Sequence, residues 1–119
     1  MKRETGEVRI RVRICVGDEV ALGPGKADLL EAIDAQGTLT AAGRALGMSY
    51  KRAWSLVETM NRCFESPLVE TCKGGTERGG SSLTPLGHSV LRHYRAMESA
   101  ALAAARRRAR SIEAHLTAR

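Results

Sequence analysis

The stretch that decides the fold is LTAAGRALGMSYKRAWSL, residues 39–56. It predicts two short helices, at about 40–46 and 50–64, joined by a tight turn. A helix-turn-helix needs a small residue where the two helices cross and a residue that tolerates positive φ in the turn. Gly43 and Gly47 stand at these two places. The segment therefore predicts a helix-turn-helix, with an ordinary helical hairpin as the alternative.

The residues around the two glycines fit the same arrangement. Thr38 and Thr40 offer N-caps for the first helix, and Ser49 offers one for the second. Apolar side chains stand where the crossing must be filled: Ala42, Leu46, Met48, Ala53 and Leu56. Caps, turn and crossing therefore all predict the same pair of helices.

Polar and basic residues gather at the start of the second helix. A recognition helix presents its first residues to the major groove of DNA. Lys and Arg can contact phosphate or guanine there, and Ser and Tyr can bond phosphate or base edges. We therefore predict a DNA-contacting face formed by Ser49, Tyr50, Lys51, Arg52 and Ser55.

Trp54, the only tryptophan of the chain, lies on the same helix. Core packing is the favoured interpretation, because an indole buries a large apolar area. The alternative places it at the rim of the helix, where it would brace Lys51 or a backbone phosphate.

A hairpin is predicted after the second helix. Residues 68–73 and 81–83 are strand-like, and the glycine-rich GGTERGG, 74–80, joins them. Lys73 and Arg78 flank or interrupt the glycines and could contact phosphate. The spacing of Gly74 and Gly79 imitates a nucleotide-binding loop, but the lysine and the following helix of that motif are missing. We interpret the hairpin as the wing of a winged helix.

The N-terminal part of the chain combines strand and helix signals. Residues 8–16, VRIRVRICV, alternate strictly and predict a half-buried strand, followed by a second short strand at 20–22. A helix is predicted at 26–36, with Gly37 as its stop. The arginine face of the first strand is interpreted as solvated, with phosphate contact as the alternative.

The last helix is predicted to begin at Pro85 behind the N-cap Thr84 and to reach about residue 115. Its apolar residues step by threes and fours, as in a coiled coil. Because so long a helix outruns a small domain, we predict a dimer seam rather than packing on the chain's own core alone. The predicted seam residues are Val90, Tyr94, Met97, Ala101, Leu102, Ala105 and Ile112. The chain then divides into a DNA-binding domain, 1–100, and a basic helical extension, 101–119.

Composition limits the classes of function. The 119 residues carry a net charge of +6, which favours an anionic partner, with nucleic acid first. No apolar run is long enough to cross a bilayer, and the N-terminus has no signal-peptide pattern. The three cysteines and three histidines lack metal-ligand spacing, and no catalytic motif is present. We expect a cytoplasmic protein without metal, cofactor or enzymatic activity.

Two segments, GTLTAAGRALGMSYKRAWSLVETMN (37–61) and PLVETCKGGTERGGSSLTPLG (67–87), resemble the N-terminal DNA-binding domain of ModE-type molybdate-responsive transcription regulators. The helix-turn-helix is also similar to that of LysR-type regulators. The resemblance implies a winged helix that dimerises through its helices on a palindromic operator. It places Thr38 and Thr40 on the helix that abuts the DNA backbone, and residues 73–80, including Thr76, in the wing.

Two-domain members of this family carry a C-terminal molybdate-binding module. The sequence ends at Arg119, so we expect a single-domain form or an excised domain without that module. The predicted fold is mainly α with a small β component, a winged helix-turn-helix with a long C-terminal dimerisation helix. The predicted function is a homodimeric, sequence-specific DNA-binding regulator, and the resemblance implies a link to molybdenum metabolism. A winged-helix protein-interaction module without specific DNA binding is the alternative.

Overall fold

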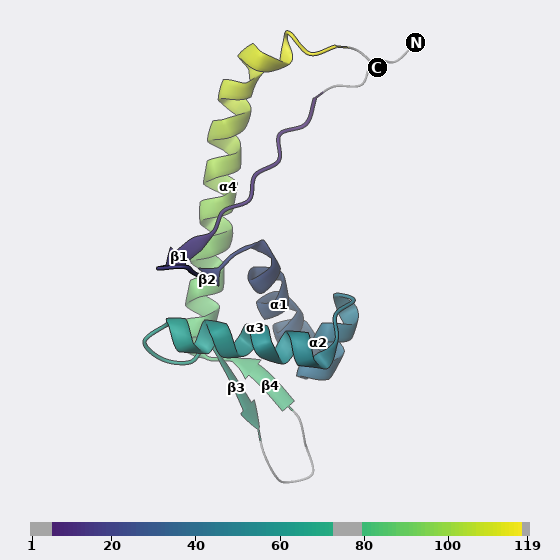
Figure 1. Cartoon of the computed structure of the whole chain (residues 1–119), viewed down its shortest axis with the longest axis vertical. Helices are drawn as coiled ribbons and strands as arrows, with labels where there is room; N and C mark the ends of the chain where they lie inside the picture. Colours follow the sequence, from purple (N-terminus) through teal and green to yellow (C-terminus); the bar gives the residue numbers. More distant parts are fainter. Residues whose placement is uncertain (1–5, 73–79, 118–119) are drawn as a thin grey trace.

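The computed structural model describes residues 6–72 and 80–117. It confirms a mainly helical fold with a small β component (Figure 1). In chain order the elements are β1 (Ile14–Val16), β2 (Glu19–Leu22), α1 (Pro24–Gln36), α2 (Leu39–Ala45), α3 (Tyr50–Cys63), β3 (Val69–Cys72), β4 (Gly80–Leu83) and α4 (Pro85–Glu113).

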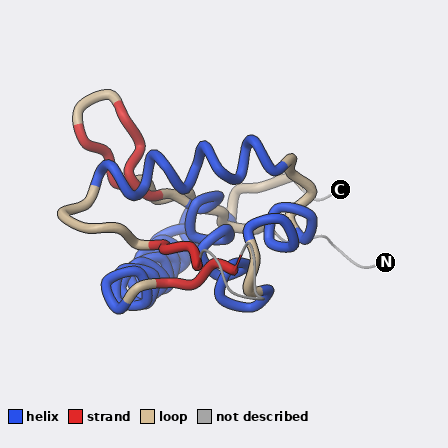
Figure 2. Tube along the Cα trace, turned by 90° about the horizontal axis from the view of Figure 1, so that it is seen from below, coloured by secondary structure: helices blue, strands red, loops and turns tan. Residues whose placement is uncertain are grey.

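The first three helices form a head around one apolar core. Leu29, Leu30 and Ile33 of α1 are fully buried, as is Met60 of α3. Seen from below, in Figure 2, the β3–β4 hairpin is on the side of the head that faces the viewer, and α4 is viewed end-on. The core therefore fixes α3 by one face and leaves the opposite face free.

Local signals in the sequence placed the helix boundaries within two residues; α1, for example, begins at Pro24 rather than at residue 26, because proline suits the first position of a helix. Gly37 ends α1 with φ of 79°, and Thr38 caps α2 by accepting a hydrogen bond from the backbone N–H of Ala41 at 3.0 Å. Ser49 caps α3 in the same way, and Thr84 caps α4. Thr40, the other predicted cap of α2, lies inside that helix instead.

The helix-turn-helix is confirmed at its two glycines. Gly47 has φ of 69°, in the left-handed region that favours glycine. A Cβ on Gly43 would lie 3.2 Å from the backbone oxygen of Met48 and 3.5 Å from the Cβ of Ala53. Gly43 therefore lets α2 and α3 approach closely, as the sequence predicted.

The β3–β4 hairpin is fastened to the head at both strands. Val69 pairs with Leu83 and Thr71 pairs with Ser81 in an antiparallel ladder. The Ser81 N–H donates to the Gly37 oxygen at 2.8 Å, which ties β4 to the turn between α1 and α2. The predicted wing is therefore confirmed as a hairpin, and its tip, 73–79, lies outside the described residues.

The N-terminal strand is shorter than the alternation of residues 8–16 predicted. Only Ile14–Val16 pairs, with β2, and the register shifts between Ile14 and Cys15. Residues 6–13 run extended beside α4, where Val8, Ile10 and Val12 are half-buried (Figure 1). Ile14 and Val16 are exposed by 40% and 58%, and Cys15 between them is exposed as well, so the alternation of the sequence does not separate a buried from an exposed face in β1.

Helix α4 belongs to the head at its start and leaves it towards its end. Tyr94 is buried, and its hydroxyl donates to the Val12 oxygen at 2.6 Å. This burial raises the pKa of Tyr94 above its ordinary value. Arg95 binds Asp28 and Glu31 of α1 and Glu98 of its own helix at 2.7–2.8 Å. Tyr94 and Arg95 thus fasten the first half of α4 to the head.

Candidate nucleic-acid interface

The exposed face of α3 carries the residues that the sequence predicted. Lys51, Arg52 and Ser55 are exposed, and the Tyr50 side chain is 55% exposed. Ala53, Val57 and Met60 point into the core, so helical periodicity turns the polar residues outward. The N-terminal half of α3 therefore presents two cations and two hydroxyl groups to solvent.

The cations of this face differ from those that hold the head together. Arg62, near the end of α3, binds Glu19 at 2.7 Å and holds the pKa of that carboxyl below its ordinary value. Among residues 6–72 and 80–117, no carboxylate lies within ion-pairing distance of Lys51 or Arg52. Their charges are therefore available to an anionic partner.

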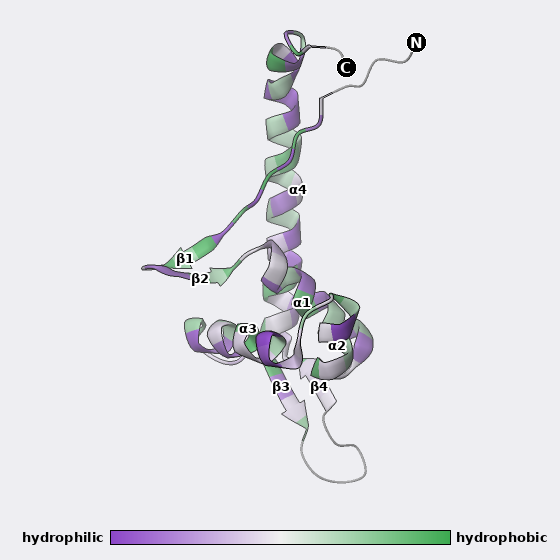
Figure 3. Cartoon of the chain, turned by 45° about the vertical axis from the view of Figure 1, so that its right-hand side comes forward, coloured by the Kyte–Doolittle hydropathy of each residue, from purple (hydrophilic) through white to green (hydrophobic). Residues whose placement is uncertain are grey.

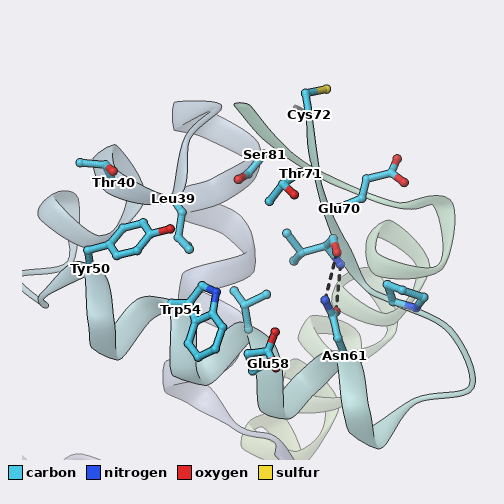
Figure 4. Close-up of a pocket in the computed structure, with 13 residues that line it drawn as sticks. Leu39, Thr40, Tyr50, Trp54, Glu58, Asn61, Glu70, Thr71, Cys72 and Ser81 are labelled. Carbon is cyan, nitrogen blue, oxygen red and sulfur yellow. Dashed lines mark hydrogen bonds between the residues drawn. The ribbon is translucent and has the colours of Figure 1, made fainter. Parts of the chain in front are cut away.

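Trp54 does not pack in the core, which corrects the favoured interpretation of the sequence. Its side chain is 49% exposed and lies one helical turn beyond Tyr50. The two aromatic side chains form the flank of α3 that faces the hairpin, beside the polar ridge (Figure 4). Two of the four aromatic residues in the chain thus lie on the surface rather than in the core.

A groove of about 860 Å³ separates this flank from the hairpin, and we call it the α3–hairpin groove. Sequence reasoning gave no support to a pocket, because the groove exists only once the hairpin is folded back beside α3. The groove is lined by Leu39, Thr40, Tyr50, Trp54, Val57, Glu58, Asn61, Pro67, Val69, Glu70, Thr71, Cys72 and Ser81.

One end of the groove is closed by Asn61, which the sequence did not single out. Its Oδ1 accepts from the backbone N–H groups of Leu68 at 2.8 Å and Val69 at 3.2 Å, and its Nδ2 donates to the Val69 oxygen at 3.1 Å. These bonds fasten the end of α3 to the start of β3. No local pattern could have revealed them, since the partners lie seven and eight residues away.

Ser81, which the sequence also did not single out, lies towards the other end of the groove. Its residue is only 6% exposed, and its hydroxyl has no hydrogen-bond partner among the described residues. Leaving a buried hydroxyl unsatisfied costs about 1–3 kcal/mol. The hydroxyl faces the groove (Figure 4).

The remaining predicted contact residues have mixed positions. The Ser49 and Thr38 oxygens each accept one hydrogen bond as helix caps, and each hydroxyl hydrogen remains to donate to a partner. Thr40 is exposed at the rim of the α3–hairpin groove. Lys73, Thr76 and Arg78 lie outside the described residues, so their contacts stay predictions.

The predicted dimer seam on α4 is only partly open. Tyr94 must be removed from it, because this side chain is 2% exposed inside the chain's own core. Leu102 lies beside Val8 and Ile10 of the N-terminal segment. Met97 is 37% exposed and Ile112 is 65% exposed.

The half-buried Val90 packs partly against the core, and half-buried Ala101 and Ala105 lie between the exposed ends of the seam. Apolar and polar residues alternate along this part of α4 in Figure 3.

The arginine-rich part of α4, residues 106–110, lies far from the hairpin. Residues 106–110 begin about 30 Å along the helix from Pro85, at a rise of about 1.5 Å per residue. In Figure 1 this part of α4 and the β3–β4 hairpin lie at opposite ends of the molecule. Within one chain, residues 106–110 and the exposed face of α3 therefore cannot contact the same short stretch of a partner's surface.

The described part of the chain has neither a membrane-spanning helix nor a cluster of metal-binding side chains. No helix within residues 6–72 and 80–117 has the length and apolar character needed to span a membrane. Within the same ranges, no group of three or more His, Cys, Asp or Glu side chains is placed to hold a metal ion.

A helix-turn-helix followed by an antiparallel hairpin that flanks its second helix defines the winged helix-turn-helix class. Solved structures support this fold. The CbnR DNA-binding domain, solved in complex with DNA, has a TM-score of 0.57 at 23% identity, over 73% of this chain and 95% of that one. Full-length CbnR, complexed with its target DNA, gives 0.56 at 23% identity, over 71% of this chain and 28% of that one.

The resemblance to ModE-type proteins is confirmed by sequence relatives. The chain is 40% identical over 79 residues to the molybdenum-pterin-binding protein MopA of Rhodobacter capsulatus, covering 66% of this chain and 30% of MopA. It is 40% identical over 78 residues to the molybdenum transport protein ModE of Azotobacter vinelandii, covering 66% and 29%.

It is also 35% identical over 71 residues to the DNA-binding transcriptional dual regulator ModE of Escherichia coli K12, covering 60% and 27%. No family model matches the sequence. The chain is thus related to ModE over the aligned 71 to 79 residues. It spans about 30% of the length of MopA and of the Azotobacter vinelandii ModE.

Proposed function

We propose that this protein is a cytoplasmic, sequence-specific DNA-binding transcription regulator, without enzymatic activity, that acts as a homodimer on a palindromic operator in molybdenum metabolism. The observation that carries the proposal is the exposed N-terminal half of α3. It combines Lys51 and Arg52, which no described carboxylate neutralises, with the hydroxyl groups of Tyr50 and Ser55. Such a helix start suits the major groove.

The hairpin supports the same placement. With α3 in the major groove, the β3–β4 hairpin beside it would reach the neighbouring sugar-phosphate backbone. The ModE relative from E. coli is named as a DNA-binding transcriptional regulator, and CbnR was solved with DNA. Because the chain covers about a third or less of the ModE relatives, their regulatory activities and their connection to molybdenum are carried over only as part of this proposal.

The direct test is selection of bound sequences from a random duplex pool, with and without molybdate. We expect enrichment of a palindrome with half-site centres about 10 base pairs apart. Binding to random duplex at low salt without enrichment would remove sequence specificity. No binding at micromolar protein would contradict the proposal and favour the protein-interaction module.

The homodimer is the second part of the proposal. Exposed Met97 and Ile112 and half-buried Ala101 and Ala105 supply an apolar stripe on α4. A small-residue stripe between two larger apolar side chains suits close helix pairing. Light scattering should give a dimer for the wild type and a shift to monomer for Ile112→Asp, whereas Arg107→Asp should leave the mass unchanged. A monomeric wild type at tens of micromolar would contradict this part.

A further inference from the structure

The α3–hairpin groove has two ends of different chemistry. At one end the three polar bonds of Asn61 are made within the chain. Towards the other end, the Ser81 hydroxyl is buried and unpartnered among the described residues. A buried hydroxyl without a partner is uncommon, because its desolvation is not repaid. The groove therefore contains a hydrogen-bonding position that the fold itself does not use.

Two further donors border the same space. Figure 4 shows the Tyr50 hydroxyl and the indole nitrogen of Trp54 directed into the groove, with Ser81 on the opposite wall. The indole N–H can only donate, and both hydroxyl groups can donate. None of the described residues that line the groove is cationic, and three convergent donors suit an oxygen-rich acceptor. The carboxylates of Glu58 and Glu70 also line the groove: Glu58 lies beside Trp54, one helical turn further along α3, and Glu70 is turned away from Trp54.

The position of the groove identifies the source of this acceptor. It lies between the helix proposed to enter the major groove and the hairpin proposed to reach the adjacent backbone. A strand of duplex DNA bordering the major groove would pass through this gap, and its phosphates carry the acceptor oxygens. We propose that the α3–hairpin groove holds one backbone phosphate of each half-site through Tyr50, Trp54 and Ser81. This inference rests on the proposed DNA-binding function.

The proposed contact fixes register and carries no base sequence. Phosphate contacts position a protein on the duplex, whereas base contacts specify the site. Neutral donors on rigid side chains hold a phosphate in one geometry, whereas the long side chain of a lysine can contact it from a range of positions. The exposed Trp54 side chain, 49% accessible, would cover the neighbouring deoxyribose. Trp54 and Ser81 are thus positioning residues for the reading done by Lys51 and Arg52.

The test uses the full chain and a selected duplex in which one phosphate at a time is replaced by a neutral methylphosphonate. We expect wild-type affinity to fall about tenfold at one phosphate per half-site, the size of a lost charged hydrogen bond. Trp54→Phe and Ser81→Ala should each weaken binding to the unmodified duplex by a similar factor. Each should then show a smaller loss than the wild type when that phosphate is neutralised, because one of the three donors is already missing.

Two controls separate a phosphate contact from a structural effect. Thr59→Ala removes a hydroxyl of α3 that donates to the Ser55 oxygen at 3.1 Å and does not line the groove, and it should keep the full methylphosphonate response. Ser81→Ala should unfold at the same or a higher temperature than wild type, because it removes an unpartnered buried hydroxyl. A clear fall in its melting temperature would show an internal partner for Ser81 and overturn its role.

The sources of the phosphate are also distinguishable. Trp54 is the only tryptophan, so its fluorescence reports on the groove. Duplex should change this fluorescence, and millimolar inorganic phosphate should not. A response to free phosphate without methylphosphonate coupling would overturn the backbone assignment. If the wild type binds duplex but no phosphate couples to Trp54 or Ser81, this inference alone fails; if it binds no duplex, the proposed function fails as well.

Discussion

The two ends of the α3–hairpin groove differ in how their polar groups are satisfied. Asn61 makes three hydrogen bonds that fasten α3 to β3, whereas Ser81 is buried and its side chain makes none to any residue that the structure describes. A satisfied buried network stabilises one structure, and an unsatisfied group costs stability unless a ligand repays it. The difference separates the part of the groove that holds the fold from the part that is open to a partner.

The largest expected effect is on the unfolding free energy, and it comes from Gly87, which packs against Leu68 beside the end of the groove that Asn61 closes. A Cβ there would stand 2.1 Å from the Leu68 oxygen, which accepts the Thr84 N–H at 2.9 Å. Gly87→Ala must push α4 away from the start of β3, so we expect a loss of about 3 kcal/mol in unfolding free energy. Chemical denaturation measures it. Gly25→Ala, with open space around its Cβ, should be neutral or slightly stabilising; equal losses in both variants would contradict this packing.

Asn61→Ala should give the next largest effect. It leaves the N–H groups of Leu68 and Val69 without their acceptor, so we expect roughly 2–3 kcal/mol of lost stability. Asn61→Asp keeps that acceptor and loses only the donor to the Val69 oxygen, and should lie between Ala and wild type. Urea denaturation at neutral pH measures all three. A neutral Asn61→Ala would mean that the hairpin is held by other contacts.

On the exposed face of α3, the cations Lys51 and Arg52 should affect DNA binding and not folding. Lys51→Ala or Arg52→Ala should weaken binding to a selected duplex by about 1–3 kcal/mol if the side chain reads a base. Both should leave the melting temperature unchanged, because neither cation is ion-paired within the described residues. Equal losses on selected and scrambled duplex would identify phosphate contacts, and no loss on either would remove these residues from the interface.

The smallest effect tests a contact outside the groove. Arg95 holds the pKa of Glu31 below its ordinary value, chiefly through their hydrogen bond. The stability that this interaction contributes is complete at pH values above the pKa of Glu31 in the unfolded chain. It is lost as the pH falls through the lower pKa that Glu31 has in the folded protein. Glu31→Gln should therefore destabilise the protein by at most about 1 kcal/mol at neutral pH, with a difference that shrinks in acid. Thermal unfolding from pH 7 to pH 3 measures it; a constant difference would exclude the linkage.

The elements of the head could be predicted from the sequence because their signals are local. Gly37, Gly47, Ser49 and Thr84 each act within a few residues, and the periodicity of α3 separates core from surface. The hydroxyl and cation side of α3 was predictable for the same reason.

The groove was not predictable, because it depends on contacts between distant segments. Ser81 is positioned by the Gly37 oxygen, and Tyr94 is buried against Val12, 82 residues earlier. Trp54 lies at the edge of the buried face of α3, where periodicity alone does not decide between core and rim. Residues 6–13 alternate like a strand, yet no described strand pairs with them, and alternation does not supply a partner.

The central claim, that the N-terminal half of α3 reads a DNA sequence, is tested most directly by one ratio. It is the affinity of the wild-type chain for its selected duplex divided by that for a scrambled duplex, at one fixed salt concentration. We predict a ratio of about 10³ or more, as for specific DNA-binding proteins. A ratio near one, with the same salt dependence on both duplexes, would contradict it.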